Sequence, residues 1–395
     1  MKRKRRLLFT IDSLRIGGAE KSLITLLGML DFARYDVDLQ LFSHIGELMK
    51  NVPPEVRILP LPEHTGFFSQ PIYKKALSPF KFIRHLKYSL SLRKKDLSVS
   101  QRNLYFWKLI RPYIKGRKGQ YDIAIAYSQG VSTYYTIEKV NATKKFGWIN
   151  AEINCEEVIK SEMQNYYGSL DKIVAVSEGV RDYLIKEIFS DLNDKITVIK
   201  DILNPNTIRE LSSLEAPSLK KDDSPVIMTV GRLDKDVKGY DIALKTAVEL
   251  KSRGVKFKWY VIGDGPDRKS IQEYIDKNNL KDNFVLLGSV VNPYPFMRQC
   301  DVYVQTSRRE GFGLTIAEAK ILNRPVICTR FKGSELQITH EKNGLLSSFA
   351  HKEIADKIER MLNDKALTRN IQQSLKEEEI GNTEEIEKFY KLIEE

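Results

Sequence analysis

The chain has 395 residues, of which 42% are hydrophobic and 29% are charged, and its formal net charge is +12. This length favours two domains over one, and the charged fraction excludes a membrane-embedded body. No apolar run approaches the ~20 residues that a membrane-spanning helix needs. The three cysteines are spaced for neither a disulfide framework nor a zinc site, so we expect free thiols in a reducing cytoplasm at Cys155, Cys300 and Cys328.

Strand-like and helix-like stretches alternate through the first half of the chain. After a basic tip, the apolar stretch 7–11 is too short for the hydrophobic core of a signal peptide, so residues 5–14 are predicted to form a first buried strand. A glycine turn and a helix over 19–30 follow. Further strands are expected at near-continuous apolar runs with polar ends, a pattern typical of strands covered on both faces: 36–43, 56–61, 121–128, 144–150 and 172–177.

Positive charge is concentrated in one segment of this first half. Residues 63–120 hold 14 Lys/Arg against only Glu63 and Asp96, and aromatic residues are interleaved with the cations. This composition suits the headgroup region of an anionic membrane. A solvated cover remains an alternative reading, and basic residues mixed with aromatics also occur in nucleic-acid-binding proteins. We therefore expect an anionic partner for this segment, with a membrane surface favoured.

The second half is more regular. Residues 204–224 gain proline, serine and charge, which indicates a connection between domains. From residue 225, strands and helices alternate in the manner of a doubly wound parallel sheet, so the predicted fold class is α/β with two Rossmann-like domains, 1–203 and 204–375. Ligands of such domains bind at the carboxyl ends of the strands. The segment 376–395 is predicted to contain a packed C-terminal helix.

Two cations follow the first strand of the second domain. Arg232 comes directly after "TVG", where the chain leaves a buried strand, and Lys238 lies in a glycine-punctuated loop that opens a helix. Arginine offers a bidentate fork and lysine a point charge, and both would lie near a helix N-terminus, so the pattern suits a bound diphosphate. A pair of solvated surface cations is the alternative interpretation.

Two glutamates in "TSRREGFGLTIAEAKIL" are separated by seven residues. Glu310 precedes a predicted helix and Glu318 lies about two turns below it, a spacing that does not fit a hydrolytic carboxylate pair. The backbone N–H groups of 312–315 would point from the helix N-terminus towards a phosphate. Glu310 would then accept hydrogen bonds from a sugar and Glu318 from a ribose. Alternatively, Glu310 is a loop charge paired with Arg309, and Glu318 is a surface carboxylate near Lys320.

In this order and spacing, the motifs closely resemble the family 4 glycosyltransferases, which have the GT-B architecture of two facing Rossmann-like domains. The resemblance covers nearly the whole chain and is strongest over 225–346. It rests on "VGRL" with Arg232 and Lys238, "VIGDGPDR" (261–268), "LLGSV" (286–290), "PYPFMRQCDVYVQTS" (293–307), the pair Glu310 and Glu318, and "SLRIGGAEKS" (13–22).

The resemblance implies a role for each matching residue. Arg232 and Lys238 would bind the donor diphosphate and stabilise the leaving group, while Glu310 would hold the transferred sugar. Glu318 would hold the nucleotide ribose. The last helix would cross back onto the first domain. Further donor contacts would come from Gly17, Gly18, Val290, Phe312, Gly313, Leu314 and Thr315.

Two positions depart from the family pattern. Many relatives carry a histidine that faces the reacting sugar, where this chain has Asn150, an acceptor-side candidate that cannot ionise. Relatives also often have asparagine in the interdomain connection, where this chain has Asp201. Neither change touches the predicted diphosphate site.

The resemblance implies a retaining glycosyltransferase of bacterial capsule, O-antigen or exopolysaccharide synthesis. It would move a hexose or N-acetylhexosamine from a nucleotide-sugar, with UDP favoured, to a saccharide or polyprenyl-diphosphate-linked saccharide. No metal-ligating motif stands out, so we predict no cofactor and no required metal. The expected location is cytoplasmic, at the inner face of the cell membrane, without a nucleic-acid partner. The alternatives are a nucleotide-sugar epimerase or another non-transferase GT-B enzyme and, more remotely, a nucleic-acid-binding protein.

Overall fold

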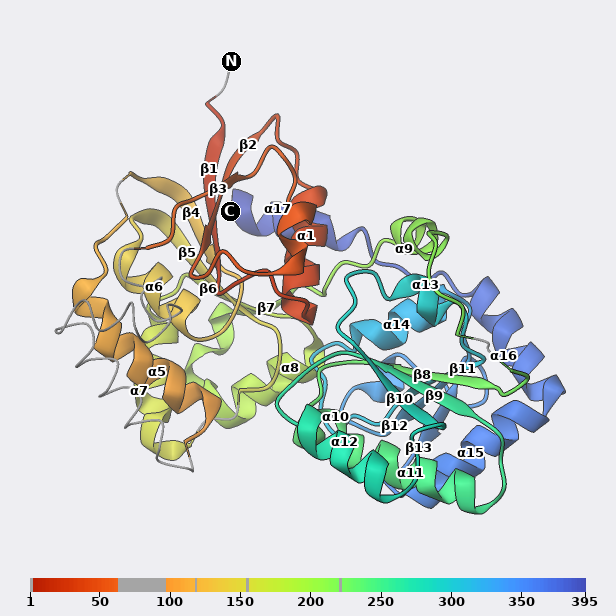
Figure 1. The fold of residues 1–395 in the computed structure, drawn as a ribbon. Helices are drawn as coiled ribbons and strands as arrows, with labels where there is room; N and C mark the ends of the chain where they lie inside the picture. Colours follow the sequence, from red (N-terminus) through yellow and green to blue (C-terminus); the bar gives the residue numbers. More distant parts are fainter. Residues whose placement is uncertain (1–2, 63–96, 118, 154–155, 220–221) are drawn as a thin grey trace. The chain divides into compact units, whose positions relative to one another are not determined.

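Figure 1 shows the fold in a computed structural model, which describes residues 3–62, 97–117, 119–153, 156–219 and 222–395. Cys155 and most of the basic segment 63–120 lie outside these ranges. The chain divides into two compact units, one made of residues 1–201 with 384–395 and the other of residues 202–383. The sequence predicts these boundaries after residues 203 and 375. Among the helices in the described ranges, none has both the length and the apolar composition required to cross a lipid bilayer.

The first unit contains a seven-stranded sheet in the order β3-β2-β1-β4-β5-β6-β7. Every pair of neighbouring strands in it is parallel. Leu7 to Ile11 of the first strand are all buried, because helices cover both faces of a parallel sheet. The strands are β1 (Arg5–Ile11), β2 (Tyr35–Leu41), β3 (Arg57–Ile58), β4 (Tyr121–Ala126), β5 (Ala142–Ile149), β6 (Lys172–Ala175) and β7 (Ile196–Val198).

Helices connect these strands, as parallel pairing requires. The C-terminal helix belongs to this unit, since the ring of Tyr390 stacks on that of Tyr35 with centroids 5.9 Å apart, and Phe389 lies 6.1 Å from Phe9. In the described part of the first unit, the α-helices are α1 (Gly18–Gly28), α5 (Val99–Ile110), α6 (Val131–Lys139), α7 (Glu157–Gly168), α8 (Glu178–Tyr183) and α17 (Glu385–Glu394).

The second unit contains a six-stranded sheet in the order β10-β9-β8-β11-β12-β13. Its pairs are also all parallel. The strands are β8 (Val226–Val230), β9 (Lys258–Ile262), β10 (Phe284–Gly288), β11 (Val302–Gln305), β12 (Val326–Thr329) and β13 (Leu345–Ser347). The helices are α9 (Pro205–Ser212), α10 (Lys235–Lys238), α11 (Tyr240–Ser252), α12 (Arg268–Lys277), α13 (Tyr294–Met297), α14 (Leu314–Ile321), α15 (His351–Asn363) and α16 (Lys365–Glu377).

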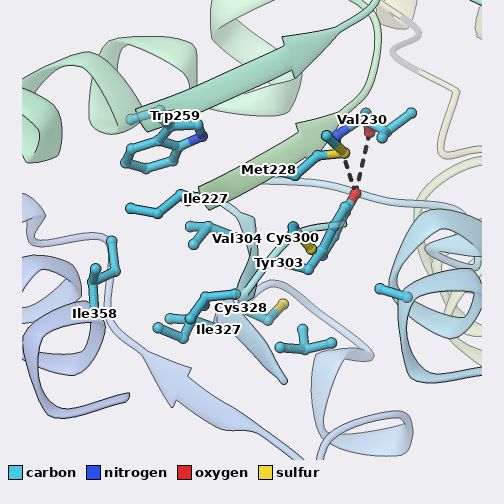
Figure 2. Packing of buried hydrophobic residues seen from close by; sticks show 14 of the residues in the cluster. Ile227, Met228, Val230, Trp259, Cys300, Tyr303, Val304, Ile327, Cys328 and Ile358 are labelled. Atoms are coloured by element: carbon cyan, nitrogen blue, oxygen red, sulfur yellow. Dashed lines mark hydrogen bonds between the residues drawn. The ribbon is translucent and has the colours of Figure 1, made fainter. Parts of the chain in front are cut away.

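The core of the second unit lies between this sheet and the helices that flank it. Figure 2 shows side chains of the central strands packed together with Ile358 of α15. The buried indole of Trp259 is not left unpaired, because its Nε1 donates to the Thr229 hydroxyl at 3.0 Å. Cys300 and Cys328 are buried in this core and form no disulfide, as expected for these two cysteines.

The strand order of each sheet reverses at one point. In the second unit, the chain runs outward from β8 to β10 and then returns to add β11 on the other side of β8. The loops that follow β8 and β11 therefore leave the same edge of the sheet from neighbouring strands. Ligands of doubly wound folds bind at this switch point. In the first unit, β1 and β4 occupy the equivalent positions.

Candidate active site

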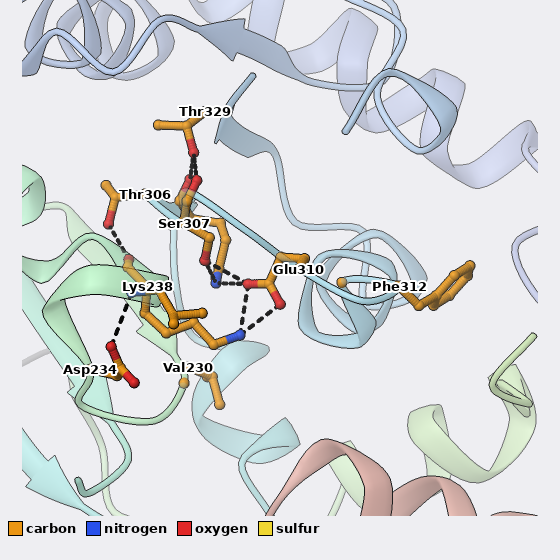
Figure 3. A network of polar contacts seen from close by, with 12 residues as sticks. Val230, Asp234, Lys238, Thr306, Ser307, Glu310, Phe312 and Thr329 are labelled. Atoms are coloured by element: carbon orange, nitrogen blue, oxygen red, sulfur yellow. Dashed lines mark hydrogen bonds and ion pairs between the residues drawn. The ribbon is translucent and has the colours of Figure 1, made fainter. Parts of the chain in front are cut away.

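The loops after β8 and β11 are joined by an ion pair. Lys238, the last residue of α10, donates to both carboxylate oxygens of Glu310, with Nζ 2.7 Å from Oε1 and 2.6 Å from Oε2. The Glu310 side chain is 8% exposed and that of Lys238 is 22% exposed. Figure 3 shows the two side chains pointing toward each other at the centre of a polar network. The structure therefore pairs Glu310 with Lys238, not with Arg309.

Gly239 makes this approach of the two loops possible. Its φ of 66° lies in the left-handed region, and a Cβ atom there would lie 2.1 Å from the carbonyl oxygen of Thr306. The position therefore requires glycine on both conformational and steric grounds. The Thr306 hydroxyl donates to the Lys238 carbonyl at 3.1 Å, which fastens the loop after β11 to the end of α10 (Figure 3).

Glu310 is held from inside the unit by two further donors. Nε2 of Gln305 lies 2.9 Å and Oγ of Ser307 lies 2.5 Å from Glu310 Oε1. Burial, with the nearby charge of Glu310, raises the pKa of the Cys328 thiol and of the Tyr240 hydroxyl. The carboxylate is thus a fixed negative charge in a largely dry surrounding, compensated by one ammonium and two neutral donors.

Arg232 lies beside this pair along the chain but is not part of it. It follows Gly231, whose Cβ position would be 3.8 Å from Cδ of Lys238. Tyr240 donates to the Gly231 carbonyl at 2.8 Å and fixes that turn. The Arg232 side chain is exposed, and within the described residues it makes no ion pair or side-chain hydrogen bond. Its guanidinium is therefore available to a ligand.

Helix α14 begins next to Glu310. Gly313 precedes it with φ 81° and, among the described residues, no side chain caps the helix, so its first N–H groups are open to an anion. Phe312 and Leu314 are partly buried against the core of the unit, as is Val290 in the loop after β10. Thr315 in the first turn of α14 is half-buried.

Glu318 lies on the inner side of α14. It is only 3% exposed, so the alternative of a surface carboxylate is wrong. Tyr294 donates to Glu318 Oε1 at 2.8 Å, and burial together with the charge of Glu318 raises the pKa of Tyr294 well above its usual value. Lys320 does not compensate this charge, since it pairs with Glu378 at 2.7 Å.

The remaining predicted residues belong to the first unit. Gly17 caps α1 in an extended conformation and Gly18 is the first residue of that helix. A Cβ atom on Gly17 would lie 2.2 Å from a carboxylate oxygen of Glu20, so glycine leaves room for this side chain. Asn150 follows β5, and its Nδ2 donates to the Tyr127 carbonyl at 2.8 Å, which fixes the orientation of the amide.

Three polar residues that contact the predicted carboxylates are missing from the sequence-based site. They are Gln305, Ser307 and Tyr294, all buried at 9% exposure or less. The available signal is a glutamine at the end of the otherwise apolar strand "VYVQ", because a polar residue buried in a central strand needs a partner. Among the described residues, no group of three or more His, Cys, Asp or Glu side chains is placed to hold a metal ion.

The chain is similar in sequence and in fold to known glycosyltransferases. Residues 213–378 match a family model described as glycosyl transferases group 1. The chain is 31% identical over 210 residues to the capsular polysaccharide biosynthesis glycosyltransferase CapM of Staphylococcus aureus, a match that covers 50% of this chain and 54% of CapM. The chain thus spans about half the length of that relative, and 43% of an uncharacterized glycosyltransferase of Methanocaldococcus jannaschii.

One curated relative matches over more of its length, and the fold is shared with solved structures. The N-acetylgalactosamine-N,N'-diacetylbacillosaminyl-diphospho-undecaprenol 4-alpha-N-acetylgalactosaminyltransferase of Campylobacter jejuni is 26% identical over 328 residues, covering 83% of this chain and 81% of that protein. The crystal structure of Anabaena HepE in complex with UDP and glucose superposes with a TM-score of 0.71 at 16% identity, over 99% of each chain. The chain therefore has the GT-B fold, and its residues 213–378 are similar to the glycosyl transferases group 1 family.

Proposed function

We propose that this protein is a retaining, metal-independent glycosyltransferase that moves a hexose or N-acetylhexosamine from a nucleotide-sugar, with UDP favoured, to a saccharide acceptor. The observation that carries the proposal is the contact between Lys238 and Glu310 at the switch point of the second sheet, beside the uncapped start of α14. In a nucleotide-sugar, the anomeric carbon of the sugar is bonded directly to the diphosphate. An ammonium that binds the phosphate and a carboxylate that binds the sugar would therefore lie next to each other.

The diphosphate would be bound by positive groups of the second unit. An ammonium carries three N–H bonds, and Lys238 directs its contacts in the described residues to Glu310 and leaves one N–H for a phosphate oxygen. Arg232 adds an exposed guanidinium, and the first N–H groups of α14 add the positive end of a helix. Together they would stabilise the charge that develops on the leaving diphosphate, which is the contribution that a metal ion makes in other enzymes.

The two carboxylates would hold hydroxyl groups and take no covalent part in transfer. Oε1 of Glu310 accepts from Lys238, Gln305 and Ser307, whereas Oε2 accepts only from Lys238 among the described residues. Oε2 therefore keeps acceptor capacity for a sugar hydroxyl. Glu318, held by Tyr294, would accept from the ribose. The acceptor hydroxyl would attack the oxocarbenium-like carbon from the face of the departing phosphate, whose oxygen takes the proton.

The relatives favour an acceptor in bacterial surface polysaccharide synthesis, and one of them is named for a diphospho-undecaprenol-linked acceptor. We include a lipid-linked saccharide acceptor and a peripheral position at the cytoplasmic membrane face in the proposal. In the described part of the basic segment, Lys108 of α5 and Arg111, which follows α5 directly, form ion pairs with Glu162 and Glu138. Membrane attraction would therefore depend on other residues of the segment, including the exposed Arg102. Failure to sediment with phosphatidylglycerol vesicles at low salt would contradict the membrane position.

A donor panel tests the central proposal. Nucleotide release is measured from UDP- and GDP-linked hexoses and N-acetylhexosamines, with and without undecaprenyl-diphosphate-linked saccharides. The expected result is acceptor-dependent release from a UDP-sugar and a product that keeps the anomeric configuration of the donor. Interconversion of the sugar without any acceptor would instead identify an epimerase. A protein that releases no nucleotide with any combination would refute the transferase assignment.

A further inference from the structure

Gln305 occupies a position between a buried tyrosine and the sugar-side carboxylate. It is the last residue of β11 and is 1% exposed. Its Nε2 donates to Glu310 Oε1 at 2.9 Å and to Ser307 Oγ at 2.8 Å, and its Oε1 accepts from the Tyr303 hydroxyl at 2.8 Å. That hydroxyl accepts from the backbone N–H of Val230 at 3.3 Å, at the end of β8. A continuous hydrogen-bonded chain thus runs from β8 to Glu310.

The orientation of the Gln305 amide is determined by its neighbours. A carboxylate only accepts hydrogen bonds, so the amide must present its NH₂ group to Glu310 and its carbonyl to Tyr303. Burial raises the pKa of Tyr303 well above its usual value, so the hydroxyl keeps its proton and can donate it to the amide carbonyl. Turning the amide around would place two oxygens against each other in a dry site.

We infer that Gln305, with Ser307, is a positioning residue for the proposed transfer: it occupies Oε1 of Glu310 and so directs Oε2 to the hydroxyl of the donor sugar. This inference rests on the proposed function. The two oxygens of Glu310 differ in the structure, since three donors reach Oε1 and Lys238 alone, among the described residues, reaches Oε2. A carboxylate fixed at one oxygen cannot rotate away from a bound sugar, and precise placement of the sugar determines the rate of transfer.

The inference assigns Gln305 to the sugar and not to the nucleotide. The Gln305 side chain contacts Glu310, Ser307 and Tyr303, and none of these contacts involves Arg232 or Glu318. Loss of the Gln305 donor should therefore slow transfer without weakening the binding of UDP alone. General damage to the site would slow transfer and also weaken the binding of UDP.

Two substitutions of similar length test this. Gln305→Met removes the donor and keeps the volume, and it should lower kcat at least tenfold while UDP affinity, measured by titration calorimetry, stays within twofold of wild type. Gln305→Glu places a second carboxyl group against Glu310. Like charges disfavour full ionisation, so the two groups would share a proton at low pH and repel each other at higher pH.

The pH profile separates positioning from packing. Gln305→Glu should transfer best at acidic pH and lose activity as pH rises, whereas Gln305→Met should follow the wild-type profile at a lower rate. Among the described residues, the ionisable groups that interact with Glu310 are Lys238, Tyr240, Tyr303 and Cys328, and all four are present in every variant. Wild-type transfer from a UDP-sugar together with near-normal kcat in Gln305→Met would overturn the inference. Absence of transfer by the wild type would instead refute the proposed function.

Discussion

The ammonium of Lys238 lies within 2.7 Å of both carboxylate oxygens of Glu310, although 72 positions separate the two residues in the chain. The contact brings together the last residue of α10 and the loop before α14, which follow the neighbouring strands β8 and β11. Both side chains are less than a quarter exposed, so water screens their interaction only in part. The Lys238 ammonium and the Glu310 carboxylate are thereby fixed next to each other at one edge of the sheet.

Replacing either partner should reveal this coupling. Lys238→Met keeps the chain length but leaves the Glu310 charge without its ammonium, so transfer should fall by about 10²–10³-fold, the scale for removing one preorganised electrostatic contact. A double-mutant cycle with Glu310→Gln, followed by denaturant unfolding, should give a coupling free energy of about 0.5–3 kcal/mol. Strictly additive effects on the free energy of unfolding would show that the ion pair is absent in solution.

Arg232 should behave differently because its side chain is exposed. Arg232→Ala is expected to change the free energy of unfolding by less than about 0.5 kcal/mol, as for most surface substitutions. The rate of transfer should nevertheless fall, because the guanidinium is assigned to the leaving diphosphate. The expected loss of transition-state stabilisation is about 2.7–4 kcal/mol. Arg309→Ala is the matched control, since Arg309 is also exposed and lies directly before Glu310. Near-normal transfer by Arg232→Ala would remove Arg232 from the site.

Tyr294 should affect the nucleotide side of the site. Tyr294→Phe removes only the hydroxyl that donates to Glu318 at 2.8 Å. A hydrogen bond to a charged group contributes about 1.5–3 kcal/mol, so the affinity for UDP should fall by roughly 10-fold or more. Inhibition constants for UDP and for ribose 5-phosphate measure the effect, and both should rise. If only sugar selection changed and UDP bound as before, the assignment of Glu318 to the ribose would be wrong.

The fold could be predicted from the sequence because strands that are buried on both faces appear as near-continuous apolar runs. The run "PVIMTVG" forms β8, and all five residues of that strand are buried. The predicted α/β class and the GT-B architecture are confirmed by the two parallel sheets and by the structural neighbours. The α/β class depends on residues that are close together in the chain, where spacing carries the information, whereas the GT-B architecture was expected from the family resemblance.

The contacts of the site were harder to predict from the sequence, because they depend on the order of the strands in the sheet. Sequence proximity suggests Arg309 as the partner of Glu310, whereas the adjacency of β8 and β11 supplies Lys238. In the sequence, Gln305 looks like an ordinary polar residue at the end of a strand. Only the structure shows that its side chain lies between Tyr303 and Glu310 and bonds to both. Tyr294 likewise contacts Glu318 from a different helix. The functional roles of all these residues stay predictions.

Chelation tests the proposed independence from metal ions. If Arg232, Lys238 and the N-terminus of α14 stabilise the leaving diphosphate, the transfer rate in excess EDTA should stay within about twofold of the untreated rate, because no ion contributes to that charge. Mg²⁺ and Mn²⁺ should have no stimulating effect on the treated enzyme. Loss of transfer in EDTA, reversed by either ion, would contradict the proposal and assign the compensating charge to a bound metal.

Asp201 should make the stability of the protein depend on pH. Burial raises the pKa of this carboxyl to about 7, although the Ser22 hydroxyl, at 2.5 Å from Oδ1, works in the opposite direction. In the unfolded chain the carboxyl titrates near its model value of 3.8, so the folded state binds more protons between about pH 4 and pH 7. Stability should therefore fall as pH rises through this interval and change little from this group above it.

Asp201→Asn isolates this contribution. The amide can still accept a hydrogen bond from Ser22 but cannot ionise. The variant should resemble the wild type at about pH 4 and become the more stable of the two as pH rises to about 7, because it avoids the cost of burying a charge. Thermal unfolding at a series of pH values measures the difference. Parallel stability curves for the two proteins would show that Asp201 titrates normally and is hydrated in the folded state.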